Sequence, residues 1–215
     1  MYPNFIYRIF FAWSHIGPGY SEQKYSLVVT GCFRIVKPTT TTKHELVTTH
    51  DTTGKQYSGI MFSIEAKVEG VKIQSFTTET LAYREMNVRA FTLKTEGGIN
   101  GTEDFLKDSN KWVRVSKDDG TRANFTKSRA PSDVFIHPTA IHKGSSQSFF
   151  ILGDAKILCK KVRHNKVPVG STHKSDGNIR VSVGIGKNRF SGRNFRSCVL
   201  NGSVVYSVEG EEVRM

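Results

Sequence analysis

Residues 59–68 read Gly-Ile-Met-Phe-Ser-Ile-Glu-Ala-Lys-Val, and this stretch decides the fold class. From Ile60 to Val68 every second residue is apolar, whereas the positions between them carry Met, Ser, Glu and Lys. Because successive side chains of a β-strand point to opposite faces, the alternation predicts a strand with one face on a core and one face outward. Glu69 and Gly70 then predict a turn into a second strand-like run, VKIQSF.

Strand-like runs recur through the rest of the chain, and no segment has the apolar spacing of a long helix. They lie at 86–93, 112–116, 134–137, 148–152, 155–162, 179–185 and 203–208. The spacers between them are rich in Gly, Asn, Asp and Ser, which are turn-forming residues. The pattern predicts an all-β fold, a single antiparallel β-sandwich of the jelly-roll-like kind with an N-terminal extension.

The first part of the chain differs from the rest and divides the sequence into three expected regions. Residues 1–54 combine an apolar segment with a Thr-rich linker, residues 55–208 form the sandwich domain, and residues 209–215 are a C-terminal tail. The aromatic and apolar stretch at 5–16 is interrupted by Arg8 and lacks a small-residue cleavage site. It fits an imperfect or truncated signal sequence and a buried first strand equally well.

Composition excludes several broad classes. Hydrophobic residues make up 37% of the 215 residues and charged residues 23%, and no apolar run approaches the roughly 18 residues of a membrane span. A transmembrane segment is therefore not expected. The 14 Phe, 7 Tyr and 2 Trp can supply a packed core, which argues against a wholly disordered chain.

The chain is strongly basic, and the excess charge lies in its second half. The formal net charge is +12. Residues 1–120 hold 15 basic and 13 acidic side chains, whereas residues 121–215 hold 16 and 6. Such a surface attracts polyanions, and net charge does not choose among acidic or sulfated glycans, nucleic acid and anionic lipid.

Two basic clusters are the candidate polyanion-binding residues. The first contains Lys156, Lys160, Lys161 and Arg163, and the second contains Lys187, Arg189, Arg193 and Arg196. Arginine can hold sulfate, carboxylate or phosphate oxygens in bidentate fashion. Phe190 and Phe195 lie within the second cluster, where exposed aromatic rings could stack on a sugar or a base. The alternative is that both phenylalanines are core residues at a sheet corner.

Cysteines and sequons bear on the cellular compartment. Cys32, Cys159 and Cys198 are widely spaced, so at most one intrachain disulfide can form, and Cys159 and Cys198 could be bridged or could be two buried thiols. Three N-glycosylation sequons begin at Asn100, Asn124 and Asn201, a number close to chance for this composition. Together with the fold, these features favour a secreted or cell-surface protein whose signal sequence is not clear.

Sequence motifs of enzymes are absent. There is no G-x-S-x-G elbow, H-E-x-x-H, Walker loop or EF-hand loop, and the pair Gly184 and Gly186 is not followed by the third glycine of a dinucleotide site. His137 and His142 flank a turn without an evident third metal ligand. The carboxylate pairs considered for glycoside hydrolysis are Glu65 with Glu79 and Asp133 with Asp154. None of these identifies a catalytic residue, a metal site or a cofactor, so a non-enzymatic protein is favoured.

A set of short motifs resembles a family of mostly uncharacterised algal, especially diatom, β-rich extracellular-type domains. The set comprises residues 59–67, 87–92, the Gly-rich loop through Gly101, Trp112, residues 147–150, residues 183–186, Phe190, Phe195, residues 201–202 and Tyr206. The resemblance covers about residues 56–208 and implies a β-rich fold without transferring a catalytic site. Ser63 stands where this family commonly has Asp, and the terminal segment is unusually basic.

Three functional hypotheses follow. The first is a non-enzymatic module that binds acidic or sulfated polysaccharide, or another extracellular polyanion, through the basic C-terminal surface. The alternative is a nucleic-acid-binding structural protein such as a small jelly-roll capsid subunit, although residues 1–50 do not supply the concentrated basic arm that this reading expects. The third is an enzyme with a loop-built site, which expects convergent carboxylates or histidines. The first hypothesis expects the two basic clusters to lie on the same face of the protein, and clusters on opposite faces would count against it.

Overall fold

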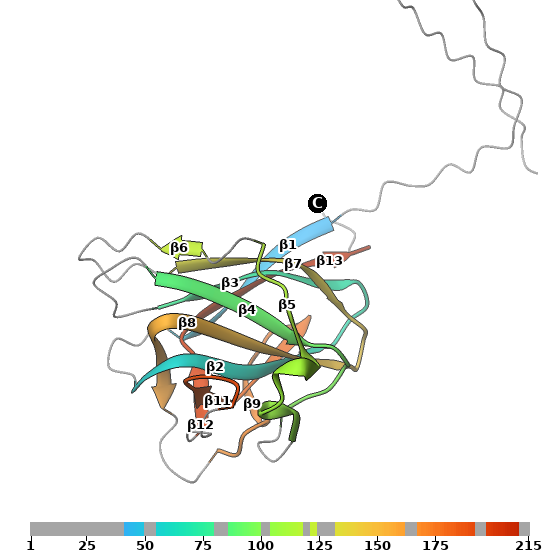
Figure 1. Ribbon diagram of the computed structural model, residues 1–215. Coiled ribbons are helices and arrows are strands. Elements are labelled where there is room, and N and C mark those ends of the chain that lie inside the picture. The colour runs from blue at the N-terminus through green and yellow to red at the C-terminus, as the bar shows by residue number, and fades with distance from the viewer. Residues whose placement is uncertain are drawn as a thin grey trace, which may run out of the picture. The chain divides into compact units, whose positions relative to one another are not determined.

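The structure is a computed structural model of the chain (Figure 1). It describes residues 41–49, 55–79, 86–99, 104–117, 121–123, 132–161, 167–191 and 197–210. Within these ranges the chain is almost entirely β, with two short 3-10 helices, η1 (Asp104–Leu106) and η2 (Ser109–Lys111). The predicted all-β sandwich is confirmed, since two antiparallel sheets pack against each other.

The smaller sheet has four strands in the order β1-β13-β3-β7. Their bounds are β1 Thr41–Thr49, β13 Gly202–Glu209, β3 Val71–Thr78 and β7 Ser132–Ile141. Residues 115–117 run along β7, where the His137 N–H donates to the Val115 carbonyl at 2.8 Å and the Lys117 N–H donates to the Phe135 carbonyl at 3.1 Å. The β7 edge is thereby partly covered, which limits its pairing with another chain.

The larger sheet has nine strands in the order β5-β4-β8-β12-β11-β2-β10-β9, and β6 pairs with β4. The bounds are β2 Lys55–Ala66, β4 Met86–Leu93, β5 Trp112–Arg114, β6 Thr121–Ala123, β8 Ser146–Lys161, β9 Thr172–Ser175, β10 Ile179–Ser182, β11 Gly184–Lys187 and β12 Ser197–Leu200. The alternating stretch that opened the prediction is β2, which pairs with β8 over most of its length.

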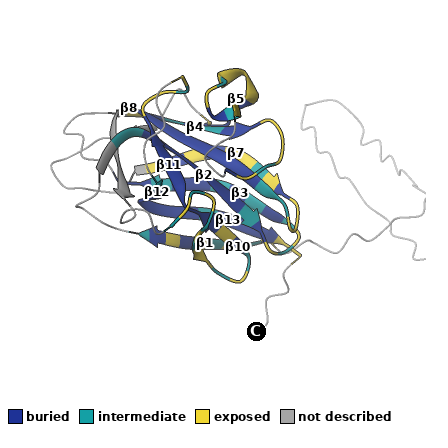
Figure 2. Cartoon of the chain, turned by 90° about the horizontal axis from the view of Figure 1, so that it is seen from below, coloured by how far each residue is buried: buried dark blue, intermediate teal, exposed yellow. Residues whose placement is uncertain are grey.

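The main core lies between the two sheets. Ile60, Phe62 and Ile64 of β2 are at most 1% exposed and face this core, as their alternation predicts. The Phe62 ring packs edge-on against Phe76 of β3 with centroids 5.6 Å apart, and Phe76 contacts Phe149 of β8 at 5.2 Å. Aromatic side chains from both sheets therefore interlock at the centre of the sandwich, where Figure 2 shows the strands mostly buried.

A second core covers the opposite face of the nine-stranded sheet. Met61, Phe150 and Ile185 point away from the main core and pack under the segment that contains η1 and η2. Trp112 of β5 joins them, and its indole Nε1 donates to the Phe105 carbonyl at 2.9 Å. This sheet is thus buried on both faces, and for this reason Met61 interrupts the apolar–polar alternation of β2.

The Thr-rich segment that was predicted to be a linker is a strand. β1 pairs with β13 from Thr41, opposite Glu209, to Thr49, opposite Gly202. Leu46 and Thr48 are buried, and the Thr48 hydroxyl lies 2.7 Å from the carbonyl oxygens of both Leu200 and Gly202, to either of which it can donate its one proton. The sandwich therefore includes Thr41–Thr49, which the predicted boundary at residue 55 had placed in the linker. Threonine favours strands, but a Thr run between turn residues also resembles a linker.

Four strands close on themselves at one end of the larger sheet. β2 pairs with β8 on one side and with β11 on the other, while β12 joins β8 to β11. The register shift between Tyr57 and Gly59 lets β8 bend there. Gly184 and Gly186 are required for this close packing, because a Cβ on Gly184 would lie 2.0 Å from the Met61 carbonyl oxygen and one on Gly186 would lie 2.3 Å from the Tyr57 ring.

Candidate polyanion-binding surface

The topology brings the described parts of the two predicted basic clusters, the backbone of the basic run of β8 and the turn with Arg189, to the same end of the nine-stranded sheet. On one side of β2, Tyr57 pairs with Ile157 and Lys55 pairs with Cys159, within the basic run of β8. On the other side, Gly59 pairs with Lys187, the last residue of β11. The start of β2 therefore contacts both segments: residues 55–57 pair with the basic run of β8, and Ser58 and Gly59 contact Asn188 and Lys187. The name "basic end" is used below for residues 55–59, 156–161 and 187–191.

Arg189 is the exposed cation of the second cluster whose side chain the structure describes. It lies in the turn at 188–191 that follows β11. This turn is anchored to β2, because the Ser58 N–H donates to Asn188 Oδ1 at 3.0 Å. Asn188 was not among the predicted site residues, and a lone Asn after a strand gives no signal in the sequence that separates an anchor from an ordinary turn residue.

Lys187 does not belong to the exposed surface, so its predicted role in contacting a polyanion is wrong. Its side chain is 0% exposed, and the ammonium Nζ donates to the carbonyl oxygens of Leu106 and Phe190. Burial, together with the neighbouring positive charge of Lys107, lowers its pKa from 10.5 to about 8. The alternation with buried Ile185 was the signal that could have placed Lys187 inward, but lysine is seldom fully buried.

Phe190 is half-buried and packs against the second core, close to the alternative interpretation. Its ring contacts Phe150 at a centroid distance of 4.9 Å and Phe91 at 5.1 Å, both edge-on. It also lies 6.0 Å from Trp112. These contacts leave less of the ring for stacking, so binding at this end relies mainly on charge and hydrogen bonds.

The remaining predicted residues divide into two groups. Lys156, Lys160 and Lys161 lie on β8, where Val199 of β12 pairs with Lys160 and Cys198 pairs with Lys161. Their backbone is described but their side chains are not. Arg163, Arg193, Arg196 and Phe195 lie outside the described residues. The candidate site is thus defined by strand register and by Arg189.

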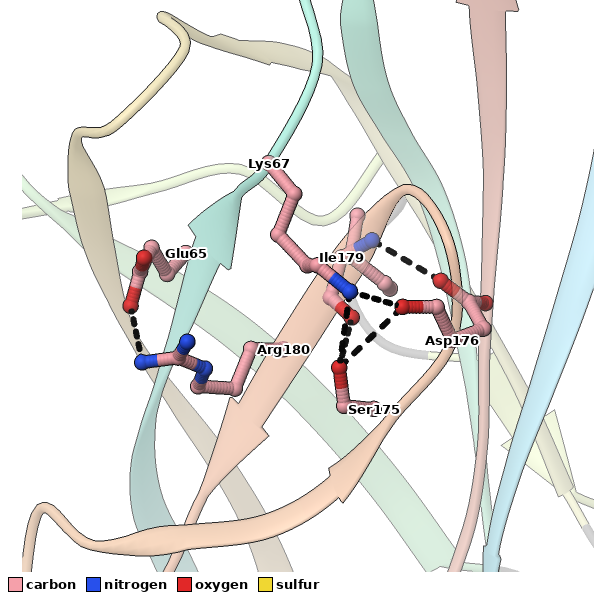
Figure 3. Close-up of polar contacts among 6 residues, drawn as sticks. All are labelled: Glu65, Lys67, Ser175, Asp176, Ile179 and Arg180. Carbon is pink, nitrogen blue, oxygen red and sulfur yellow. Dashed lines mark hydrogen bonds and ion pairs between the residues drawn. The ribbon is translucent and has the colours of Figure 1, made fainter.

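A further group of charged residues lies at the other end of β2, and its charges are already partnered (Figure 3). The Arg180 guanidinium lies 3.1 Å from Glu65 Oε2. Lys67 donates to the carbonyl of Asp176, and the Asp176 carboxylate accepts the Ile179 N–H at 2.8 Å. These contacts fix the β9–β10 turn, and they leave this end less able than the basic end to hold an anion.

The candidate catalytic groups are not brought together. Glu65 lies on β2 of the larger sheet, whereas Glu79 follows β3 of the smaller one. Asp133 and Asp154 are likewise on different sheets, on β7 and β8. His142 lies 3.8 Å from Glu96 and is largely exposed. No group of three or more His, Cys, Asp or Glu that could hold a metal occurs among the described residues.

The structure describes the surroundings of Cys198 and of Asn201, the two described residues that bear on the cellular compartment. Cys198 is fully buried and disulfide-bonded, so the interpretation as a free thiol is wrong for this residue. Asn201, the first residue of the third sequon, is also fully buried, and its amide Nδ2 donates to Glu79 Oε2 at 3.0 Å. A glycan on Asn201 has no room in this fold. The sequons at Asn100 and Asn124 lie outside the described residues.

Comparisons with family models, with curated proteins and with solved structures found no match. Within the described residues, no helix is long and apolar enough to cross a membrane. The fold and the charge distribution therefore carry the functional argument.

Proposed function

We propose that this chain is a non-enzymatic β-sandwich module that binds an acidic or sulfated polysaccharide, or another extracellular polyanion, at the basic end. The observation that carries the proposal is the strand register, which places the basic run of β8 and the turn with Arg189 beside residues 55–59. Segments separated by about 30 residues in sequence thereby contribute positive charge to one region. Clusters on opposite faces of the sheet would argue against this function, and the side chains that decide this point lie outside the described part of the chain.

The chemistry of the site favours recognition by charge. Arginine and lysine hold sulfate and carboxylate oxygens through charge-assisted hydrogen bonds, which are about twice as strong as neutral ones. The Phe190 ring already packs against Phe91, Trp112 and Phe150, which leaves less of it for stacking on a sugar. A polymer with closely spaced anionic groups is accordingly a better ligand than a neutral glycan.

The disulfide at Cys198 supports the extracellular part of the proposal, because disulfides persist in oxidising compartments and are rare in the cytosol. A secreted or cell-surface location is therefore proposed together with the ligand class. The resemblance to algal β-rich extracellular-type domains agrees with this location and contributes no binding residue.

The experiment is a binding panel with the full chain. A sulfated polysaccharide, a neutral glycan and single-stranded nucleic acid are each titrated at low and near-physiological salt. The proposal predicts that binding to the sulfated polysaccharide persists at the higher salt, while neutral glycan does not bind. Preferential binding of nucleic acid would instead support the nucleic-acid-coating alternative. Equal binding to every polyanion that disappears with salt would show only a nonspecific positive field.

A matched pair of variants locates the binding. The first variant replaces Arg189, Arg193 and Arg196 with Ala. The second replaces Lys43, Lys117 and Lys143, which are exposed and lie away from the basic end, so that the change in net charge is the same. The proposal predicts a loss of affinity in the first variant well beyond that in the second, whereas equal losses would contradict it.

A further inference from the structure

Lys187 joins two segments that are far apart in the sequence. Its ammonium donates to the Leu106 carbonyl, at the end of η1, and at 2.9 Å to the carbonyl of Phe190, in the turn after β11. Leu106 is itself fully buried in the second core. One ammonium group thus ties the turn at 188–191 to the segment at 104–111.

Among the described residues, none around Lys187 is seen to neutralise its charge. It lies beside a core of aromatic and aliphatic side chains, and its two described acceptors are backbone carbonyls. The charged residues of the elements packed against it are Asp104, Lys107, Asp108, Lys111 and Arg189, each of which is exposed or half-buried. Of these, Lys107 acts on Lys187 through its charge, and it is repulsive. A methionine would fill this volume without the desolvation cost, so the ammonium needs a reason to be there.

The contact with Phe190 supplies that reason. Arg189 directly precedes Phe190, and Asn188 on its other side accepts a hydrogen bond from the Ser58 N–H. Arg189 is therefore held between two anchored neighbours while its own side chain is exposed. A fixed backbone reduces the conformational entropy that an arginine loses on binding an anion.

We propose that Lys187 is a buried latch that closes the turn at 188–191 and positions Arg189 for anion binding. This role rests on the proposed function, since it assigns a positioning residue to the same site. Lys187 does not touch the anion. It acts through the Phe190 carbonyl, and its loss removes the arrangement of Arg189 without removing a charge from the exposed surface.

The latch has a pH signature that ordinary packing lacks, because the neutral amine of Lys187 keeps N–H donors for both carbonyls and closes the turn more firmly than the ammonium, whose burial costs free energy. When the turn opens and Lys187 reaches water, its pKa returns from about 8 toward 10.5, so opening takes up a proton above pH 8. Opening is consequently favoured at lower pH and suppressed at higher pH. Between pH 7 and pH 9 the population of the open turn should fall about tenfold. Most of the change falls in the pH unit above the closed-state pKa of about 8, and one pH unit there corresponds to a tenfold change in the opening equilibrium.

Hydrogen exchange of the full chain tests the latch without any ligand. After correction for the intrinsic pH dependence of exchange, protection of the amides at 188–191 and 104–108 should rise about tenfold from pH 7 to pH 9. This profile should become flat in Lys187→Met. A flat profile in the unmodified protein overturns the latch even if the variant fails to fold, and an unchanged profile in a folded variant overturns it as well.

Affinity for a sulfated polysaccharide tests the positioning role. Lys187→Met should weaken binding as much as Arg189→Ala does, by about tenfold, and the double variant should be no weaker than either single one. Lys111→Met, an exposed cation with the same charge change, is the control and should have a smaller effect. Binding that survives in Lys187→Met overturns the positioning role while the proposed function stands. Absence of binding in the unmodified protein overturns the proposed function, and the exchange experiment still decides on the latch.

Discussion

At the scale of the residue, Lys187 should make the free energy of unfolding rise with pH in the alkaline range. The folded chain holds its pKa at about 8, below the ordinary value of 10.5. Between these two values the unfolded chain binds more protons than the folded one, so the free energy of unfolding rises with pH. The gain is absent below about pH 8, where the lysine is protonated in both states.

The expected gain from pH 8 to pH 10.5 is up to about 3 kcal/mol, from 1.36 kcal/mol per pKa unit. Denaturant unfolding at a series of pH values measures it. Lys187→Met should remove this component, and Lys111→Met, which changes an exposed lysine, should keep it. A variant at position 187 with the same pH dependence as the unmodified protein would show that another group titrates in this range.

Gly184 is a second residue whose identity the fold requires, because there is no room for a Cβ atom at this position. Replacement with Ala would bring the new Cβ to 2.0 Å from the Met61 carbonyl oxygen, and backbone on a neighbouring strand cannot move away easily. Gly184→Ala should therefore destabilise the domain by about 1–3 kcal/mol, as overpacked sites do. Gly177→Ala is the matched control, because nothing lies within 4 Å of its Cβ position. Thermal unfolding of both variants would test the difference, and equal melting temperatures would contradict the account.

At the scale of the element, β1 completes the smaller sheet. Leu46 is buried in the core that also contains Val204 and Tyr206 of β13, and the Thr48 hydroxyl donates its proton to a carbonyl at the β12–β13 turn. A chain that begins at residue 55 should therefore be less stable than one that begins at residue 39, and it should expose the apolar face of β13 to water. Urea unfolding and binding of a hydrophobic dye compare the two chains. Equal stability would mean that β1 is dispensable.

The disulfide of Cys198 is a second feature at this scale. The chain offers Cys32 and Cys159 as partners. In the register of β8 and β12, Cys198 faces Lys161 and Leu200 faces Cys159, so the two cysteines are diagonal neighbours on adjacent strands. We expect peptide mapping without reduction to link Cys159 to Cys198, and a link to Cys32 would contradict this. Cys198→Ser should cost about 2–5 kcal/mol, as loss of a native disulfide does.

Sequence patterns predicted strands much better than they predicted the exposure of side chains. β2, β4 and β13 follow from period-two alternation and their turn residues, and β4 spans the predicted range, Met86–Leu93. β1, β6, β9 and β12 lie outside the predicted strand runs, because short or Thr-rich strands are defined by the strands they pair with. The inward orientation of Lys187 could not be predicted, since it depends on carbonyls supplied by residues 106 and 190.

At the scale of the whole molecule, the nine-stranded sheet is buried on both faces, and the basic end lies at one end of this sheet. The second core secures the turn that carries Arg189, and the closed arrangement of β2, β8, β12 and β11 brings the basic run of β8 beside it. The backbone of the basic run of β8 and the turn with Arg189 are thereby held by the same closed group of strands. Rigid support favours selective binding over general attraction, because less entropy is lost when the ligand binds.

The most direct test of this account is a lysine footprint, in which the folded chain is acetylated with and without a sulfated polysaccharide and each lysine is quantified by mass spectrometry. The account predicts that ligand protects Lys156, Lys160 and Lys161, while Lys43, Lys117 and Lys174 are acetylated equally in both samples. Lys187, which is buried, should react slowly in both. Protection at Lys43, Lys117 or Lys174 in place of the β8 lysines would contradict the basic end as the binding site.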